Sequence, residues 1–331
     1  MDFAPFPRFA LLSGPTPIEP LRRLNTELGG ARLYVKRDDF TSIGGGGNKL
    51  RKLEFLLGEA LAQGADTVIT VGARQSNHAR QTAAVCARAG LACELVLPRI
   101  VPREDDDYLL NGNALLNDLF SAVVHDLPGD ADVAGFIAER LTKLSSEGRK
   151  VYFCPVGGSS AVGALGYAAC AAEIERQAHA LGVDFSRVTL ANGSGGTHAG
   201  LSAGFAALGK GAGLVRAYAV YSDEEITRET TYHKTVETLA LIAPDARITK
   251  DEIDVDGRHR GGGYGIPTPE MVAAVRLMAR TEGLLLDPVY SGKAFAGLLH
   301  DIRSGHFKPG ENILFVMTGG VPGLYAYRSA F

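Results

Sequence analysis

The stretch DTVITVGARQSNHARQTAAVCARAGLACELVLP, residues 66–98, contains the pattern from which the fold can be inferred. It opens with an apolar, β-branched run (66–72), continues with a helical segment (77–89) ended by Gly90, and closes on a second apolar run (92–98). A strand, a helix and a strand joined by short turns are typical of a parallel sheet that is buried on both faces. The sequence therefore predicts an α/β fold.

The same alternation continues through most of the chain. A leucine stripe predicts a helix that begins near Lys49 and ends at Gly64, and later helices are expected up to 181–182 and from 197. Further strands are expected at 151–158, 187–193, 215–222, 284–290 and 312–320. Because 331 residues exceed a comfortable single core, two domains are expected, each with a mostly parallel sheet flanked by helices.

The composition excludes several classes of protein. A net charge of -3 gives no reason to expect nucleic acid or an acidic membrane as a partner. The N-terminus does not resemble a signal peptide, and the apolar run 161–172 is too short to span a bilayer. The cysteines lack zinc spacing, so no metal is expected and a reducing cytoplasm fits best; they are Cys86, Cys93, Cys154 and Cys170.

Glycine is frequent and clustered, with 41 residues in the chain. Clusters occur at 44–47, 156–158, 192–196, 260–265 and 318–320. Glycine is favoured where the backbone needs a positive φ or must approach a ligand closely. Several clusters in one chain indicate a bound ligand surrounded by loops.

The segment NGSGGTHAGL (192–201) follows a predicted strand and opens a helix. Backbone N–H groups of such a turn form an anion site, and phosphate is its usual guest. The spacing matches neither the P-loop nor the dinucleotide fingerprint, which indicates one phosphate held by backbone with help from Ser194 and Thr197. An ordinary tight turn is the alternative.

The segment GGGGNKLRKLEF (44–55) places Lys49, Arg51 and Lys52 in the first turn of a helix, where the dipole disfavours cations. The dipole, the like charges and desolvation in a cleft would all favour the neutral amine of Lys49. A neutral amine is what a Schiff-base lysine needs. A solvated lysine on a basic turn is the alternative.

Polar residues also gather at the turn RQSNHARQ (74–81), beside the carboxyl edge of the predicted sheet. Ser76, Asn77 and His78 offer a hydroxyl, an amide and an imidazole where open α/β sheets bind ligands, and exposed helix N–H groups there would suit a carboxylate. Ser76 could instead be only a helix cap, and His78 only a surface histidine.

Three further residues border glycine or proline turns. Tyr264 lies in RHRGGGYGIP (258–267) and Tyr290 in LLLDPVYSGK (284–293), where packing is the commoner role for tyrosine. Thr318 follows a strong strand, where its hydroxyl could contact a ring nitrogen or cap a turn.

In this order the motifs resemble the D-cysteine desulfhydrase and 1-aminocyclopropane-1-carboxylate deaminase family. They are GGNKLRKLEF, QSNHARQTAA, NGSGGTHAGL, GGGYGIP, DPVYSGKAFAGL and TGG. These are enzymes of fold type II, similar to the tryptophan synthase β chain, that use pyridoxal 5'-phosphate (PLP). The resemblance covers nearly the whole chain.

The resemblance implies a role for each matching residue. Lys49 would bind the cofactor covalently and carry the α-proton, and Tyr264 and Tyr290 would flank the substrate, with Tyr290 near the reacting carbons. Ser76 would assist catalysis and, with Asn77 and His78, receive the substrate carboxylate. The implied cofactor contacts are Asn77 at the 3'-oxygen, Gly193, Ser194, Gly195, Gly196 and Thr197 at the phosphate, and Thr318 with Ser291 at the ring nitrogen.

The implied chemistry is α,β-elimination. A threonine hydroxyl cannot give the ring nitrogen a full proton, so the site favours losing a β-leaving group as soon as the α-proton departs. Departure of a thiolate converts D-cysteine to pyruvate, ammonia and hydrogen sulfide. Removal of water, as in threonine deaminases, is a weaker alternative.

Two other substrates stay open. The cyclopropane deaminases typically read DPVYEGK, whereas this chain has Ser291 in place of the glutamate, which argues for a desulfhydrase. Release of sulfite from L-cysteate would need a cation for the sulfonate. The candidates are Arg74, Arg258, His259 and Arg260.

The resemblance also implies an organisation. Residues 1–47 and 161–331 would form the larger, PLP-binding domain and residues 48–160 the smaller one, with the cofactor in the cleft between them. Enzymes of this family are usually homodimers acting on a small amino acid. A non-catalytic phosphate- or nucleotide-binding protein, which could share the sheet and the NGSGG turn, is the alternative from another class.

Overall fold

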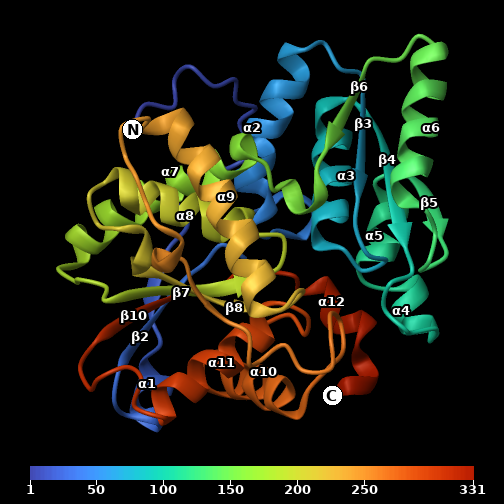
Figure 1. Cartoon of the computed structure of the whole chain (residues 1–331). Helices are drawn as coiled ribbons and strands as arrows, with labels where there is room; N and C mark the ends of the chain where they lie inside the picture. Colours follow the sequence, from blue (N-terminus) through green and yellow to red (C-terminus); the bar gives the residue numbers. More distant parts are fainter.

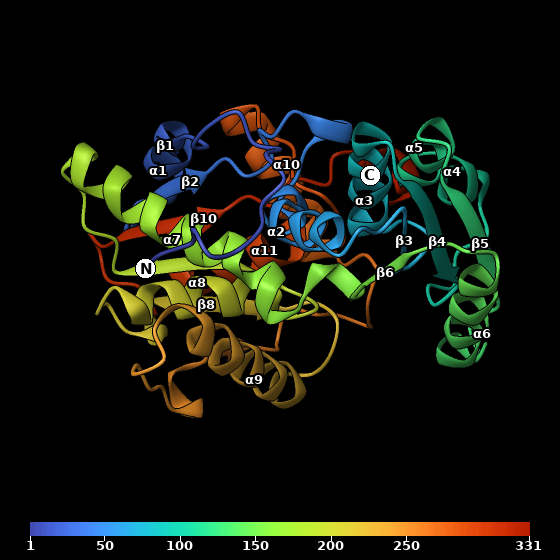
Figure 2. The same ribbon diagram turned by 90° about the horizontal axis from the view of Figure 1, so that it is seen from above.

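A computed structural model describes residues 1–331 and contains two β-sheets, which lie at opposite ends of the molecule (Figures 1 and 2). The larger sheet has six strands. In spatial order they are β1 (Ile18–Pro20), β2 (Arg32–Lys36), β10 (Asn312–Val316), β7 (Arg187–Asn192), β8 (Val215–Ala219) and β9 (Asp254–Asp256). β1 runs antiparallel to β2, and every other pair is parallel.

The smaller sheet is parallel throughout. Its order is β5 (Val123–Leu127), β4 (Ala92–Pro98), β3 (Thr67–Val71) and β6 (Val151–Cys154). The stretch 66–98 supplies its two central strands. The prediction of two mostly parallel sheets flanked by helices is confirmed.

Helices cover both faces of each sheet (Figure 1). The larger sheet is covered on one face by α7 (Ala161–Leu181), α8 (Gly196–Ala207) and α9 (Glu224–Ile242), and on the other by α1 (Arg22–Leu28), α10 (Pro269–Glu282) and α11 (Ser291–Arg303). Apolar side chains alternate along β10 between these faces: Leu314 and Val316 pack towards α7, and Ile313 and Phe315 towards α11. This alternation produces two cores on one sheet.

The smaller sheet is covered in the same way. On one face lie α2 (Lys49–Ala62), α3 (Asn77–Ala89) and α5 (Asn113–Leu119), and on the other lies α6 (Val133–Ser146). Two short helices, α4 (Asp106–Leu110) and α12 (Pro322–Ala326), pack together near the cavity described below. No helix is both long and apolar enough to cross a membrane.

The strand predicted at 284–290 is wrong, because this segment is an irregular turn that leads into α11. Pro288 has no N–H for a ladder. The Asp287 carboxylate accepts the N–H groups of Val289, Tyr290 and Ser291 at 3.0, 3.0 and 2.7 Å, so these donors are withdrawn from any sheet. Three other predicted strands are real but end three or four residues early, at Cys154, Ala219 and Val316.

A buried ionic cluster joins the start of α2 to the larger sheet. Arg51 donates to both oxygens of Asp38, at 2.8 and 2.9 Å, and to both oxygens of Glu173 on α7, each at 3.0 Å. Lys36 also pairs with Glu173. Burial alone would raise the pKa of Asp38, but the Arg51 charge and its hydrogen bonds hold that pKa below its usual value. The cluster fixes α2 to β2 and α7.

Glu173→Gln should lower the free energy of unfolding by about 3–5 kcal/mol, because it leaves buried Arg51 and Lys36 with too little compensating charge. Urea unfolding would measure the loss. Glu175→Gln on the same helix is the matched control: its exposed pair with Lys210 should contribute about 0–1 kcal/mol. Equal losses for the two variants would contradict a stabilising role for the cluster.

Candidate active site

The principal cavity has a volume of about 490 Å³ and lies between the two sheets, which is a normal size for a small-molecule site. Its walls come from the ends of β3 and β7 and from the turns that follow them, of which the second is rich in glycine. The predicted residues in its lining are Lys49, Ser76, Asn77, His78, Gly193, Ser194, Gly195, Thr197, Tyr264, Tyr290 and Thr318. Gly196 and Ser291 lie outside the lining.

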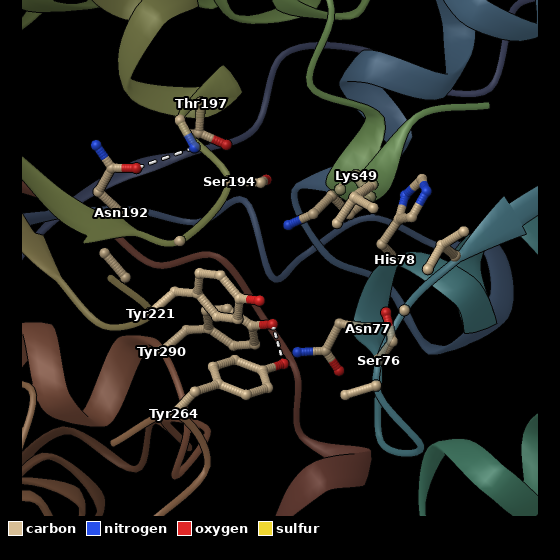
Figure 3. A pocket seen from close by; sticks show the side chains of 18 of the residues that line it. Lys49, Ser76, Asn77, His78, Asn192, Ser194, Thr197, Tyr221, Tyr264 and Tyr290 are labelled. Atoms are coloured by element: carbon tan, nitrogen blue, oxygen red, sulfur yellow. Dashed lines mark hydrogen bonds between the residues drawn. The ribbon is translucent and has the colours of Figure 1, made fainter. Parts of the chain in front are cut away.

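Lys49 is the first residue of α2, and its side chain points into the cavity (Figure 3). The amine donates to Asn48 Oδ1 at 2.9 Å. Burial lowers the pKa of Lys49 to about 8; the Asp287 charge opposes this shift and the Arg80 charge adds to it. The predicted fall of the pKa is confirmed, and a substantial share of the amine is neutral near pH 8.

The expected cause of that fall was partly wrong. Arg51 does not face Lys49, because its guanidinium turns to Asp38 and Glu173. The cation that lowers the pKa of Lys49 is Arg80, which is buried on α3 and hydrogen-bonds the carbonyls of Gly44 and Gly46. The sequence places Arg80 thirty-one residues away, so only the tertiary fold brings the two charges together.

The turn between β7 and α8 has the features of an anion site. Asn192 Oδ1 accepts the Gly195 N–H at 3.1 Å and so holds the turn in shape. The backbone N–H groups of Ser194 and Thr197 donate to no group of the protein. The Gly196 N–H, which was expected to face the phosphate, instead donates to Ser159 Oγ at 3.2 Å. Free donors at a helix N-terminus suit a phosphate.

Lys52 lies beside this turn, a placement that was not predicted from the sequence. Its side chain is buried, lines the cavity, and donates to the Gly157 carbonyl at 3.0 Å and to Ser159 Oγ at 3.2 Å. Burial, followed by the Lys49 and Lys234 charges, holds the pKa of Lys52 well below its usual value. The i, i+3 spacing from Lys49 was the available signal, since it puts both amines on one helix face.

The start of α3 forms a second donor site. Ser76 is the helix cap, and its Oγ accepts the Ala79 N–H at 3.1 Å. The N–H groups of Asn77 and His78 donate to no group of the protein. Asn113 Nδ2 donates to the Asn77 side-chain oxygen at 2.9 Å, which leaves the Asn77 amide nitrogen facing the cavity (Figure 3).

His78 is a buried residue, not the surface histidine of the alternative interpretation. Its Nε2 hydrogen-bonds Thr70 Oγ1 at 2.8 Å, and its Nδ1 has no partner in the protein. Burial, followed by the charges of Lys49 and Lys52, holds the pKa of His78 well below its usual value. The imidazole is therefore neutral at physiological pH.

Three tyrosines form the wall opposite Lys49 (Figure 3). The hydroxyl oxygens of Tyr264 and Tyr290 are 2.6 Å apart, and Lys49 Nζ is 5.8 Å from the centroid of the Tyr290 ring. Burial raises the pKa of both tyrosines, so both keep their protons at neutral pH. Tyr221, which was not predicted from the sequence, packs edge-on against Tyr264, with 5.1 Å between the ring centroids.

The remaining two predicted residues differ in their placement. Thr318 lines the cavity just after β10, and its carbonyl accepts the Asn48 N–H at 3.0 Å. Ser291 is buried at the start of α11, where its hydroxyl donates to Asp287 Oδ1 at 2.7 Å. Ser291 therefore supports the turn that carries Tyr290 and does not reach the cavity itself.

The low pKa predicts that Lys49 becomes reactive at a lower pH than an exposed lysine does. In protein freed of bound carbonyl compounds, acetylation of Lys49 should follow a midpoint near pH 8, because only the neutral amine attacks. Partly exposed Lys250 is the internal control: its hydrogen bonds to Glu225 and Glu229 hold its pKa above the usual value, so it should react only at higher pH. Mass spectrometry of peptides labelled at several pH values would measure both, and coincident profiles would contradict the shift.

Similar proteins match almost the whole chain. The D-cysteine desulfhydrase of Serratia proteamaculans (strain 568) is 43% identical over 333 residues, covering 98% of this chain and 97% of the relative. The D-cysteine desulfhydrase of Yersinia pestis (strain Pestoides F) is 46% identical over 325 residues, covering 98% and 96%.

Solved structures agree with this similarity. A crystal structure described as an ACC deaminase homologue superposes with a TM-score of 0.88 at 38% identity, covering 98% of this chain and 95% of that one. O-ureido-L-serine synthase, at 19% identity and a TM-score of 0.64 over 93% and 90% of the two chains, shares the fold. The family described as pyridoxal-phosphate dependent enzyme matches residues 10–319. This chain, whose partly buried Lys49 shares a cavity with a glycine turn of free amides, therefore belongs to the pyridoxal-phosphate-dependent enzymes of fold type II.

Proposed function

We propose that this protein catalyses the α,β-elimination of D-cysteine, giving pyruvate, ammonia and hydrogen sulfide. The observation that carries the proposal is the position of Lys49, a partly neutral amine that faces both a phosphate-sized turn and a second group of free backbone amides. The nearly full-length similarity to relatives named D-cysteine desulfhydrase supports the choice of substrate.

The residues of the cavity fit pyridoxal phosphate. Lys49 would hold it covalently, the turn from Gly193 to Thr197 would bind its phosphate, and Asn77 would bind its 3'-oxygen. Thr318 would face the ring nitrogen. Ser291 would contribute indirectly, through its hydrogen bond to Asp287. The turn that contains Gly157 packs too closely against the phosphate turn to carry a side chain, because a Cβ on Gly157 would lie 2.1 Å from Ser194 Oγ. When bound, the cofactor supplies an electron sink for the α-carbon of the substrate.

Lys52 would add charge to the phosphate site. Its amine has no carboxylate partner and lies next to Ser159, whose hydroxyl is 2.7 Å from Ser194 Oγ. A phosphate beside this amine would raise the Lys52 pKa again, because an opposite charge favours the protonated form. Lys52 would then make a charge-assisted hydrogen bond, which is stronger than the neutral contacts it makes otherwise.

The N-terminus of α3 would bind the substrate carboxylate. The free N–H groups of Asn77 and His78 offer two donors at the positive end of a helix dipole. Ser76 Oγ, held by the Ala79 N–H, lies at the same turn. This arrangement orients the α-carbon towards Lys49, which would then accept the α-proton as its neutral amine.

Tyr264 and Tyr290 would serve the leaving group. Both are protonated phenols that share a hydrogen bond at the wall facing Lys49. One of their protons can be donated to the departing sulfur, which weakens its charge while the carbon–sulfur bond breaks. The pair also excludes water from the side of the cavity where the sulfur would lie.

The placement of the cations disfavours L-cysteate as the substrate. Among charged side chains, Lys49 and Lys52 line the cavity, and none of the four proposed sulfonate ligands does. Arg74 binds Asp126, Arg258 binds Asp256 and Asp301, and Arg260 reaches the Tyr221 carbonyl. A sulfonate would be left without a guanidinium. Ser291 in place of glutamate similarly supports a desulfhydrase over a cyclopropane deaminase.

We also propose the organisation that the resemblance implies. Residues 1–47 with 161–331 would form the larger domain and residues 48–160 the smaller one. In support, all six strands of the larger sheet fall in the first set and all four strands of the smaller sheet in the second. A homodimer is proposed from the family resemblance alone, and a cytoplasmic location from the four free, buried cysteines.

A substrate panel tests the activity. Release of the 2-oxo acid should be faster from D-cysteine than from L-cysteate, serine or 1-aminocyclopropane-1-carboxylate, by about 10-fold or more in kcat/KM. The product is pyruvate from the first three substrates and 2-oxobutanoate from the last. Lys49→Ala should lose both pyruvate release and the absorbance band that borohydride shifts, whereas Lys308→Ala should keep both. Faster release from another substrate would overturn the assignment to D-cysteine, and a colourless protein that binds nucleotide would overturn the enzyme class.

Lys52→Met should raise the dissociation constant for pyridoxal phosphate by about 10- to 100-fold, because one charge-assisted hydrogen bond to the phosphate is lost. Titration of the cofactor-free protein, followed by its absorbance, would measure the change, with Lys308→Met as the exposed control. Unchanged affinity in Lys52→Met would mean that the backbone amides hold the phosphate alone.

A further inference from the structure

Lys293 is a buried lysine that the proposed reaction does not use. It is the third residue of α11, and its side chain has no solvent exposure. Its amine meets backbone oxygens and no carboxylate: it donates to the Arg260 carbonyl at 2.7 Å and to the Gly263 carbonyl at 2.8 Å. Burying a cation without an opposite charge is costly. The two carbonyls offset this cost, so the amine and the backbone that carries them are held together.

The charges around Lys293 do little to stabilise its protonated amine. Burial, followed by the Arg260 charge, lowers its pKa to about 8, against the opposing effect of the Asp287 charge. At pH 7 most of the amine is therefore protonated, and its hydrogen bonds to the two carbonyls are charge-assisted.

Both carbonyls belong to the loop GRHRGGGYGIP (257–267), which contains neither a helix nor a strand. Gly261 and Gly263 have φ values of 69° and 149°, which few other residues adopt. Glycine loses the most conformational freedom on ordering, so this loop needs anchors to hold one shape. Lys293 anchors it at the residue immediately before Tyr264.

The start of α11 therefore controls both tyrosines of the cavity wall. Tyr290 directly precedes the helix, and Asp287 accepts its N–H at 3.0 Å. Lys293, less than one turn later, holds the loop that carries Tyr264. The two hydroxyls meet at 2.6 Å in the cavity (Figure 3), although twenty-six residues separate them in the chain.

We propose that Lys293 is a positioning residue that latches the 257–267 loop onto α11 and so sets Tyr264 against Tyr290. The latch itself follows from the contacts of Lys293. Its effect on turnover rests on the proposed function, in which the tyrosine pair meets the departing sulfur.

Limited proteolysis of the holoenzyme tests the latch without reference to activity. Trypsin can cleave the loop after Arg258, whose side chain is 59% exposed, and after Arg260, but only when the loop opens. In Lys293→Met, which keeps the apolar stem and loses the donors, fragments ending at these two residues should form about 10-fold faster or more. Lys293→Arg should restore slow cleavage, and Lys308→Met, on the exposed surface, should match the parent protein.

Kinetics on the same variants test the consequence. Lys293→Met should lower kcat/KM for D-cysteine by about 10-fold or more, keep the cofactor absorbance band, and be rescued by Lys293→Arg. Unchanged loop cleavage in Lys293→Met would overturn the latch, as would loss of the absorbance band, which would indicate a general structural role. If Lys293→Met does not fold, Lys293→Gln takes its place. If the parent protein does not act on D-cysteine, the proposed function fails while the cleavage comparison still decides the latch.

Discussion

The bidentate pairing of Arg51 with Asp38 and Glu173 is the interaction on which the site depends. It joins the first turn of α2 to the segment after β2 and to α7, and all three groups are largely removed from water. Such a cluster is expensive to desolvate, and it persists only because every charge has its partner. Its consequence is that Lys49, two residues before Arg51, begins its helix at a fixed point in the cavity.

The three bases in the first turn of α2 are thus explained by three different environments. Arg51 is held by two carboxylates, Lys52 by the carbonyl and hydroxyl beside the β7–α8 turn, and Lys49 by Asn48 alone. The cost that the helix dipole imposes on cations is offset outside the helix for Arg51. For the two lysines it is reduced, because burial shifts both towards the neutral amine.

Anion binding in this cavity depends mainly on backbone. Free N–H groups at the starts of α3 and α8 belong to residues that line the same cavity as Lys49. Helix termini provide such donors without burying a further charge, so the site can hold two anionic groups and still contain a neutral amine. A side chain at Gly196 in this turn would clash with its neighbours, because a Cβ there would lie 2.5 Å from Ser159 Oγ and 2.9 Å from Lys52 Nζ.

The sequence by itself determined the α/β class, the two parallel sheets, the start of α2 at Lys49 and the glycine turn after β7. These features follow from local periodicity and from motif order, which one chain displays directly. Only the tertiary structure decided which charges meet. It placed Arg80 near Lys49, turned Arg51 away and withdrew Ser291 into the Asp287 turn. It also brought Lys52 and Lys293 to carbonyls that are thirty or more residues distant in the chain. Electrostatic and hydrogen-bond partners act over a few ångströms in space, and spacing along a sequence does not record those distances.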